Sequence, residues 1–182
     1  MRFVNPQRVF AALVLLLGTT GLTAQTADSA QVTKLLADAK AQAASAATDA
    51  ELLQSYTRST LSLESHASQI EKIRTHVNDL GRTVSEMKAA RGEASNWQQQ
   101  AIDRIDPLLQ EMADSLSTTI KHMNDNPSRI HMQPYRDYAA ATYDFANRTA
   151  EVIRDFVEYG KVKGRVAELE QKLEIDPNRA GE

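Results

Sequence analysis

The sequence predicts an all-α fold, an elongated antiparallel four-helix bundle with coiled-coil-like heptad packing. Three observations support this prediction. The 182 residues include only 7 glycines and 5 prolines, and residues with high helix propensity are abundant. Apolar side chains recur in steps of three and four along four long segments, the spacing of helices that pack lengthwise on one another. The connections between these segments are short, so consecutive helices run up, down, up and down.

The N-terminal segment, residues 1–24, has the features of a bacterial signal peptide. Two arginines precede an apolar run at positions 9–17, and small residues follow it. We expect cleavage after Ala24, with a cut after Ala27 as one alternative and an uncleaved membrane anchor as another. The apolar run is short for an anchor, because it would cross only about half of a hydrocarbon core. The mature chain is therefore expected in the periplasm or the medium.

Composition excludes several classes of function. The chain has no cysteine, which removes disulfides, thiol nucleophiles and iron–sulfur ligands. Losing Arg2 and Arg8 with the signal leaves 19 basic against 24 acidic residues, so the formal net charge goes from −3 to −5. An acidic chain has no general attraction for nucleic acid, and we expect no such partner. No segment after the signal is apolar enough to predict a membrane span.

The first helix is expected over residues 29–57. Its apolar positions form a seam made largely of alanine: Val32, Leu36, Ala39, Ala43, Ala46, Ala50 and Leu53. Thr48 and Glu51 match a capping box, so a break near residues 45–48 is an alternative to a continuous helix. If this helix is only loosely attached, the fold becomes a three-helix bundle, which is the alternative architecture.

The second helix, expected over residues 61–90, carries the most regular pattern in the chain. Eight seam positions follow one another in unbroken steps of three and four: Leu63, His66, Ile70, Ile73, Val77, Leu80, Val84 and Met87. His66 stands where leucine or isoleucine is typical. It is therefore either a core histidine bonded to a carbonyl or hydroxyl, or an axial ligand of a b-type haem.

The third helix is expected over residues 94–124, with Ser95 and Asn96 as candidate caps. Its seam positions are Ile102, Ile105, Leu109, Met112, Leu116 and Met123. Pro107 lies inside this pattern and predicts a kink or a late start. Trp97, in the first turn, is expected to cover the end of the core and to use its N–H in a hydrogen bond.

The fourth helix is expected over residues 134–174, with Pro134 in its first turn and a disordered tail at 176–182. Its heptad positions are Tyr138, Phe145, Val152, Phe156, Tyr159, Val166 and Leu173. Tyr135 and Tyr143 lie off this seam and are expected at the surface. The large seam side chains would face the alanines of the first helix, which closes the bundle.

Candidate ligands for a metal lie around the third connection. His122 with Met123, and His131 with Met132, form two His-Met pairs. Imidazole and thioether together suit Cu(I), so these four residues are candidate copper ligands. The alternative interpretation puts Met123 in the core and His122 at a helix C-terminus, where a cation is favoured.

No enzyme motif is present, so the sequence predicts a non-enzymatic, cofactor-free binding or structural protein of the cell envelope. Its partner would be another protein or an envelope component. The end of the last helix adds a homodimer interface, because four apolar residues there would form an exposed stripe: Val162, Val166, Leu169 and Leu173. The alternative function is a small ligand-binding bundle for copper, through the His-Met pairs, or for haem b, through His66.

Overall fold

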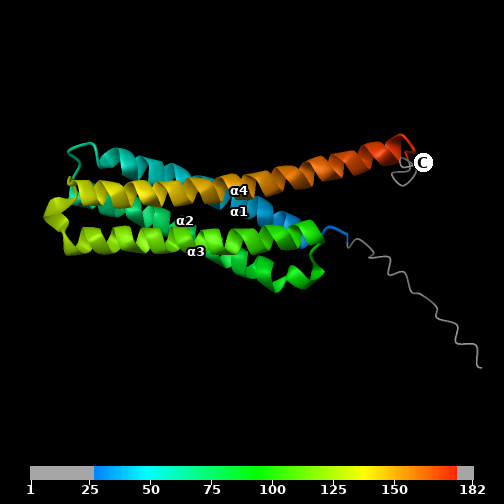
Figure 1. The fold of residues 1–182 in the computed structure, drawn as a ribbon, viewed down its shortest axis with the longest axis horizontal. Helices are drawn as coiled ribbons and strands as arrows, with labels where there is room; N and C mark the ends of the chain where they lie inside the picture. The colour runs from blue at the N-terminus through cyan, green and yellow to red at the C-terminus, as the bar shows by residue number, and fades with distance from the viewer. Residues whose placement is uncertain (1–26, 176–182) are drawn as a thin grey trace, which may run out of the picture.

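A computed structural model describes residues 27–175 of the chain. Four α-helices lie side by side in it: α1 (Ala30–Tyr56), α2 (Leu63–Ala89), α3 (Asn96–Asp125) and α4 (Gln133–Lys172) (Figure 1). Short 3-10 turns at Arg91–Glu93 and Pro127–Arg129 belong to the second and third connections. The four-helix bundle is confirmed, with each predicted helix boundary within two residues of the observed one. The predicted signal and tail lie outside the described residues.

The helices alternate in direction along one common axis. The α1–α2 and α3–α4 connections meet at one end, which we call the hairpin end (Figure 1). The opposite end, called the N-terminal end, holds the start of α1 and the α2–α3 connection, and α4 runs on beyond it. Helix α1 packs on α2 and α4, and α3 packs on the same two helices. The first helix thus closes the bundle beside the last, and the three-helix alternative is wrong.

Local sequence explains where the helices begin. The Ser29 hydroxyl accepts a hydrogen bond from the Val32 amide at the start of α1, and the Ser62 hydroxyl accepts one from the Ser65 amide at the start of α2. Ser95 caps α3 within a capping box. Helix α1 is continuous through residues 45–48, so the alternative of a break there is wrong, and α3 continues through Pro107 from a start at Asn96 rather than starting late.

The core combines two helices with small inward side chains and two with large ones. Helix α1 buries four alanines completely: Ala39, Ala43, Ala46 and Ala50. Helices α2 and α3 supply most of the bulk, including Ile73, Leu80 and Met87 on one and Ile102, Ile105 and Met112 on the other. Accordingly α1 lies close to its neighbours α2 and α4, whereas α2 and α3 approach each other least closely of the adjacent pairs.

The inward face of α4 differs from the predicted one. The buried residues are mostly small: Tyr135, Ala139, Thr142, Ala146, Thr149 and Ile153. The predicted seam was wrong for Tyr138 and Tyr159, which are 37% and 54% exposed, whereas Val166 and Leu173 are exposed as the predicted stripe requires. Tyr135, predicted at the surface, is fully buried.

The reason for this difference is that small side chains let α4 come close to its neighbours, and the Thr142 hydroxyl then bonds to α3. The Thr142 and Thr119 hydroxyl oxygens are 2.8 Å apart. Thr149 Oγ1 donates to the Phe145 carbonyl of its own helix at 2.8 Å and lies 3.4 Å from the Leu108 carbonyl of α3. These bonds satisfy polar groups that would otherwise be buried without partners.

Lengthening one alanine of α1 should destabilise the bundle. Ala43 is fully buried within the core, so Ala43→Leu would overpack it and lower the free energy of unfolding by about 1–3 kcal/mol. Ala44→Leu is the matched control, because Ala44 is exposed on the same turn and should change stability by at most about 0.5 kcal/mol. Urea denaturation measures both; equal losses would contradict the close packing of α1.

Candidate functional site

Two features stand apart from the ordinary packing of the bundle. The first is a histidine cluster at the hairpin end, formed by His66, His122 and His131 around Tyr135. The second is the projecting segment, residues 159–175, where α4 leaves the bundle at the N-terminal end. The cluster holds every residue that the sequence proposed as a haem or copper ligand except the two methionines.

His66 is fully buried on α2 near the hairpin end. Its Nδ1 lies 3.1 Å from the hydroxyl oxygen of Tyr135, the first large buried residue of α4. This is the predicted core histidine bonded to a hydroxyl. The other ring nitrogen, Nε2, is buried and has no hydrogen-bond partner.

The other two histidines approach this pair from the α3–α4 side. The His131 ring centroid lies 6.2 Å from that of His66, and His122 stacks on Tyr135 at the same centroid separation. The Tyr56 ring, from α1, packs edge to face with His66, and the two ring centroids are 5.7 Å apart. His122 Nε2 is a second buried nitrogen without a partner.

Burial shifts the titration of the central pair. It lowers the pKa of His66, because the cation loses its hydration, and the nearby His131 lowers this pKa further. Burial also raises the pKa of Tyr135, so its hydroxyl keeps its proton at any physiological pH. The cluster is therefore most stable when His66 is neutral.

The proposed copper ligands are only partly brought together. Met123 is buried in the core and Met132 is 54% exposed at the start of α4. Across residues 27–175, no three side chains of histidine, cysteine, aspartate or glutamate gather as they would around a metal ion. A haem iron would reach His66 Nε2 only after the surrounding rings moved, because His66 has no exposed surface. Copper and haem stay predictions.

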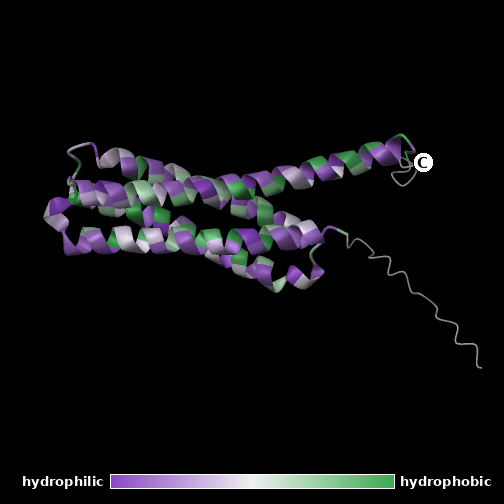
Figure 2. Ribbon diagram, in the orientation of Figure 1, coloured by the Kyte–Doolittle hydropathy of each residue, from purple (hydrophilic) through white to green (hydrophobic). Residues whose placement is uncertain are grey.

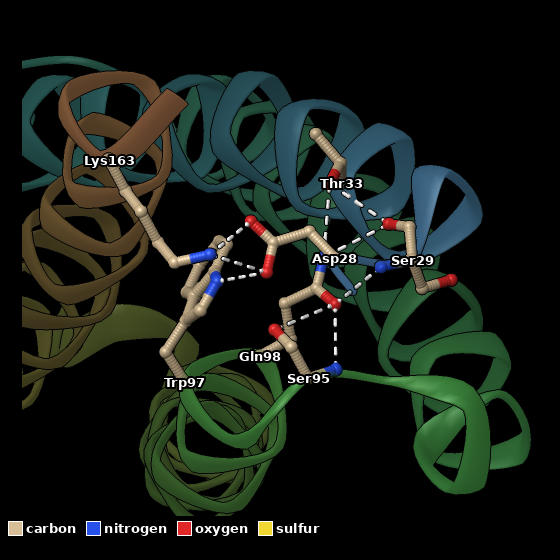
Figure 3. A network of polar contacts seen from close by, with 7 residues as sticks. All are labelled: Asp28, Ser29, Thr33, Ser95, Trp97, Gln98 and Lys163. Atoms are coloured by element: carbon tan, nitrogen blue, oxygen red, sulfur yellow. Dashed lines mark hydrogen bonds and ion pairs between the residues drawn. The ribbon is translucent and has the colours of Figure 1, made fainter. Parts of the chain in front are cut away.

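At the N-terminal end, Gln98 ties the start of α1 to the start of α3 (Figure 3). Its Oε1 accepts from the amides of Ser29 and Ser95 at 2.9 and 3.0 Å. Its Nε2 donates to the Ser29 carbonyl and the Thr33 hydroxyl, both at 3.0 Å. Gln98 is fully buried, and these four bonds satisfy both ends of its amide.

Beside this amide, Asp28 anchors the base of the projecting segment (Figure 3). It accepts from Trp97 Nε1 at 2.7 Å and from Lys163 Nζ at 3.0 Å. Burial alone would raise the pKa of Asp28, but hydrogen bonds and the Lys163 charge lower it. Trp97 lies against Gly160, where an added Cβ would stand 2.8 Å from the indole ring, and it meets Tyr159 edge to face at 5.4 Å. The predicted role of Trp97 as a cap with a bonded N–H is confirmed.

Comparisons with known proteins identify no relative. No protein-family model matches the chain, and no significant match is found among curated proteins or solved structures. Within the described part of the chain, no helix has both the length and the apolar character needed to cross a bilayer. The functional argument therefore depends on the molecule's own surfaces.

The projecting segment carries an apolar stripe whose first residue, Tyr159, meets Trp97 edge to face and whose members are all at least 39% exposed. Lys163 is the last residue of α4 whose side-chain hydrogen bonds, among those of residues 27–175, reach a residue outside α4, namely Asp28 just before α1. Beyond Lys163, apolar and charged residues alternate along the ribbon (Figure 2). The stripe consists of five exposed side chains: Tyr159, Val162, Val166, Leu169 and Leu173. Sequence analysis predicted the last four, and Tyr159 was expected in the core.

Sequence analysis missed Gln98 and Tyr135. The spacing of Ser95 and Gln98 is itself a capping-box signal, so the local role of Gln98 was readable. Its bonds to α1 were not, because its partners stand 65 and 69 positions away. Tyr135 pairs with His66 at the same long separation, and nothing local marks it.

The lowered pKa of His66 predicts a loss of stability in acid. The unfolded chain binds a proton near the ordinary histidine pKa while folded His66 does not, so stability falls as the pH drops from about 7.5 to about 5.5. His66→Asn, which does not titrate, should show a weaker dependence, and His76→Asn, outside the cluster, should keep it. Urea midpoints measured at the two pH values test this prediction. An equal change of midpoint with pH in all three proteins would refute it.

Removing the Gln98 amide should destabilise the N-terminal end. Gln98→Leu leaves the Ser29 and Ser95 amides without their acceptor, and we expect a loss of about 1–3 kcal/mol. Gln100→Leu, at an exposed position of the same helix, is the control and should be near neutral. The single tryptophan lies beside this network, so its fluorescence during urea unfolding reports both variants. Equal midpoints for the two would contradict the assignment.

Proposed function

We propose that this chain is an exported, non-enzymatic binding or structural protein of the cell envelope that acts through the projecting segment of α4. The observation that carries the proposal is the apolar stripe. Its five side chains follow heptad spacing and are between 39% and 61% exposed. A monomeric protein gains nothing from holding such a row in water, whereas a partner helix would bury it.

The charges around the stripe favour a protein partner over a lipid surface. Residues 161–174 carry four basic side chains and three acidic ones, Lys161, Lys163, Arg165 and Lys172 against Glu168, Glu170 and Glu174. Helices that lie on membranes concentrate lysine and arginine on their polar face. Charges of both signs beside an apolar seam are typical of helices that pair with other helices.

Export is the second part of the proposal, and it is supported by sequence alone. An arginine-bearing start, an apolar run and small residues before Ala24 match a signal peptide. The lack of cysteine suits an oxidising compartment, where free thiols would be oxidised.

The histidine cluster supports a second candidate function, a small bundle that binds copper or haem b. The observation in its favour is the pair of buried Nε2 atoms on His66 and His122 that have no partner, since an imidazole nitrogen with a free lone pair can ligate a metal.

Site-specific photocrosslinking tests the first proposal. A photoreactive amino acid at Val166, on the stripe, should give crosslinks to a protein in the envelope of the expressing cell. Ala167 is the matched control, because it is exposed on the same turn but lies off the stripe, and it should give few. Equal crosslinking at both positions, or none at either, would contradict binding through the stripe.

Native mass spectrometry of the same exported protein tests signal cleavage and the binding of copper or haem. Signal cleavage predicts the mass of a chain that begins at Gln25, and the mass of the full-length chain would contradict it. Bound metal or haem in that spectrum would favour the second candidate function over the first.

A further inference from the structure

The stripe has the geometry of one half of a two-stranded coiled coil. Its residues follow one another in steps of three, four, three and four, so they take the a and d positions of successive heptads. Tyr159, Val166 and Leu173 are the a positions, and Val162 and Leu169 are the d positions. The β-branched valine at a and the leucine at d are the residues typical of dimers at those places.

Apart from Tyr159, which meets Trp97, the stripe lies off the face that α4 turns to its own bundle. The buried face of α4 runs through Thr149 and Ile153 and, continued in steps of three and four, reaches Gly160 and Lys163, which contact Trp97 and Asp28. A seven-residue repeat drifts by about 20° per heptad around a straight helix. The line that starts at Tyr138 therefore turns outward along α4, where its later members are exposed.

We infer that the occupant of the stripe is a second copy of this chain, paired in parallel and in register. This inference depends on the proposed function, because it names the partner of the same surface. Its support is charge complementarity. In a parallel pair, each g residue faces the e residue five positions later on the other helix.

In this chain one g–e pair beside the stripe is free for a partner. Arg165 faces Glu170 of the partner subunit, and the two charges are opposite. The other pair, Glu158 with Lys163, also has opposite charges, but Lys163 is bonded to Asp28 of its own chain. Twofold symmetry repeats the Arg165–Glu170 pair, so two attractive contacts flank the seam.

The antiparallel arrangement places some like charges together. There e faces e and g faces g. One register sets Lys163 against Lys163 and Arg165 against Arg165 of the partner subunit, while Glu158 faces the partner's Lys172. A shift by one heptad sets Arg165 against Lys172 of the partner subunit, while Lys163 faces the partner's Glu170. Each antiparallel register therefore combines attraction with repulsion, and parallel pairing is the arrangement without repulsion between these flanking charges.

Charged residues also limit the length of the pairing. Asp155 takes the d position before Tyr159, and Arg148 takes the one before that; both are exposed. Like charges would meet across a parallel seam at both places, so the helices separate there and the two bundles lie on opposite sides of the paired segments. A seam this short predicts dissociation in the micromolar range, visible as a concentration-dependent mass.

Disulfide trapping in the mature, full-length exported protein tests the arrangement. The natural chain has no cysteine, so a single introduced thiol reports only its own contacts. Leu169→Cys, at a d position, should form a linked dimer with a mild oxidant such as diamide, because parallel strands bring the two residues together. Antiparallel strands would instead set Leu169 opposite Val166 or Tyr159 of the partner subunit. Ala167→Cys, exposed but off the stripe, is the control and should stay monomeric.

Charge exchange tests the pairing without crosslinking. Arg165→Glu places two carboxylates together on each side of the seam, and it should raise the dimer dissociation constant about tenfold in sedimentation equilibrium. Adding Glu170→Arg restores opposite charges and should return the constant toward that of the natural chain. Circular dichroism confirms that the helix content of each variant is unchanged.

The outcomes separate this inference from the proposed function. A monomer at all concentrations, without a Leu169→Cys dimer, overturns the second copy; stripe-dependent crosslinking at Val166 to another protein would then leave the proposed function standing. Tighter dimers after Arg165→Glu overturn the parallel arrangement. A monomer that binds anionic vesicles through the stripe overturns both statements.

Discussion

The rest of the structure depends on the close approach of α1 to its neighbours, which the alanine seam permits. Four fully buried alanines let α1 approach both α2 and α4 closely, and α4 meets α1 with alanine and threonine. Helix separation depends on the side chains between the axes, so α2 and α3, which supply the large residues, stay further apart. Tyr138 and Tyr159 of α4 then stay exposed, whereas Tyr135, at the start of the helix, is fully buried. The outward line of apolar side chains on α4 thus follows from the composition of α1.

The two ends of the bundle are closed by polar bonds between diagonally opposite helices. At the hairpin end His66 of α2 meets Tyr135 of α4, and at the N-terminal end Gln98 of α3 holds Ser29 at the start of α1. Neither pair joins helices that pack directly on each other, so apolar packing alone would not bring these residues together. Buried polar bonds cost much when one partner is missing, and a change of helix order would break both. They therefore favour this topology over other arrangements of the same four amphipathic helices.

The fold was readable from sequence because its signals are local. Heptad spacing, serine caps and short connections located every helix, and the alanine seam explained how the first helix closes the bundle. The inward face of α4 was not readable, because two lines of residues there have heptad spacing. One begins at Tyr135 and is mostly small, whereas the other begins at Tyr138 and is large. Choosing the large line assumed that size decides burial, but the space that neighbouring helices leave decides it. The candidate sites depend on pairs 69 and 135 positions apart, for which periodicity gives no signal.

The length of α4 is the remaining feature that packing within one chain does not explain. Its 40 residues exceed the 27, 27 and 30 of the other helices, and the part after Lys163 has no helix of its own bundle beside it. A helix as short as residues 164–172 would be marginal in water on its own, and Gly164 weakens it further. Continuity with the packed part of α4 removes the cost of nucleation, but it does not bury the stripe. A second helix against the stripe would supply the missing burial, and the alternating charges beside it would set the direction of that helix. The exposed stripe and the charges beside it, which stabilise nothing in a single chain, are therefore the residues that would make the segment a selective contact.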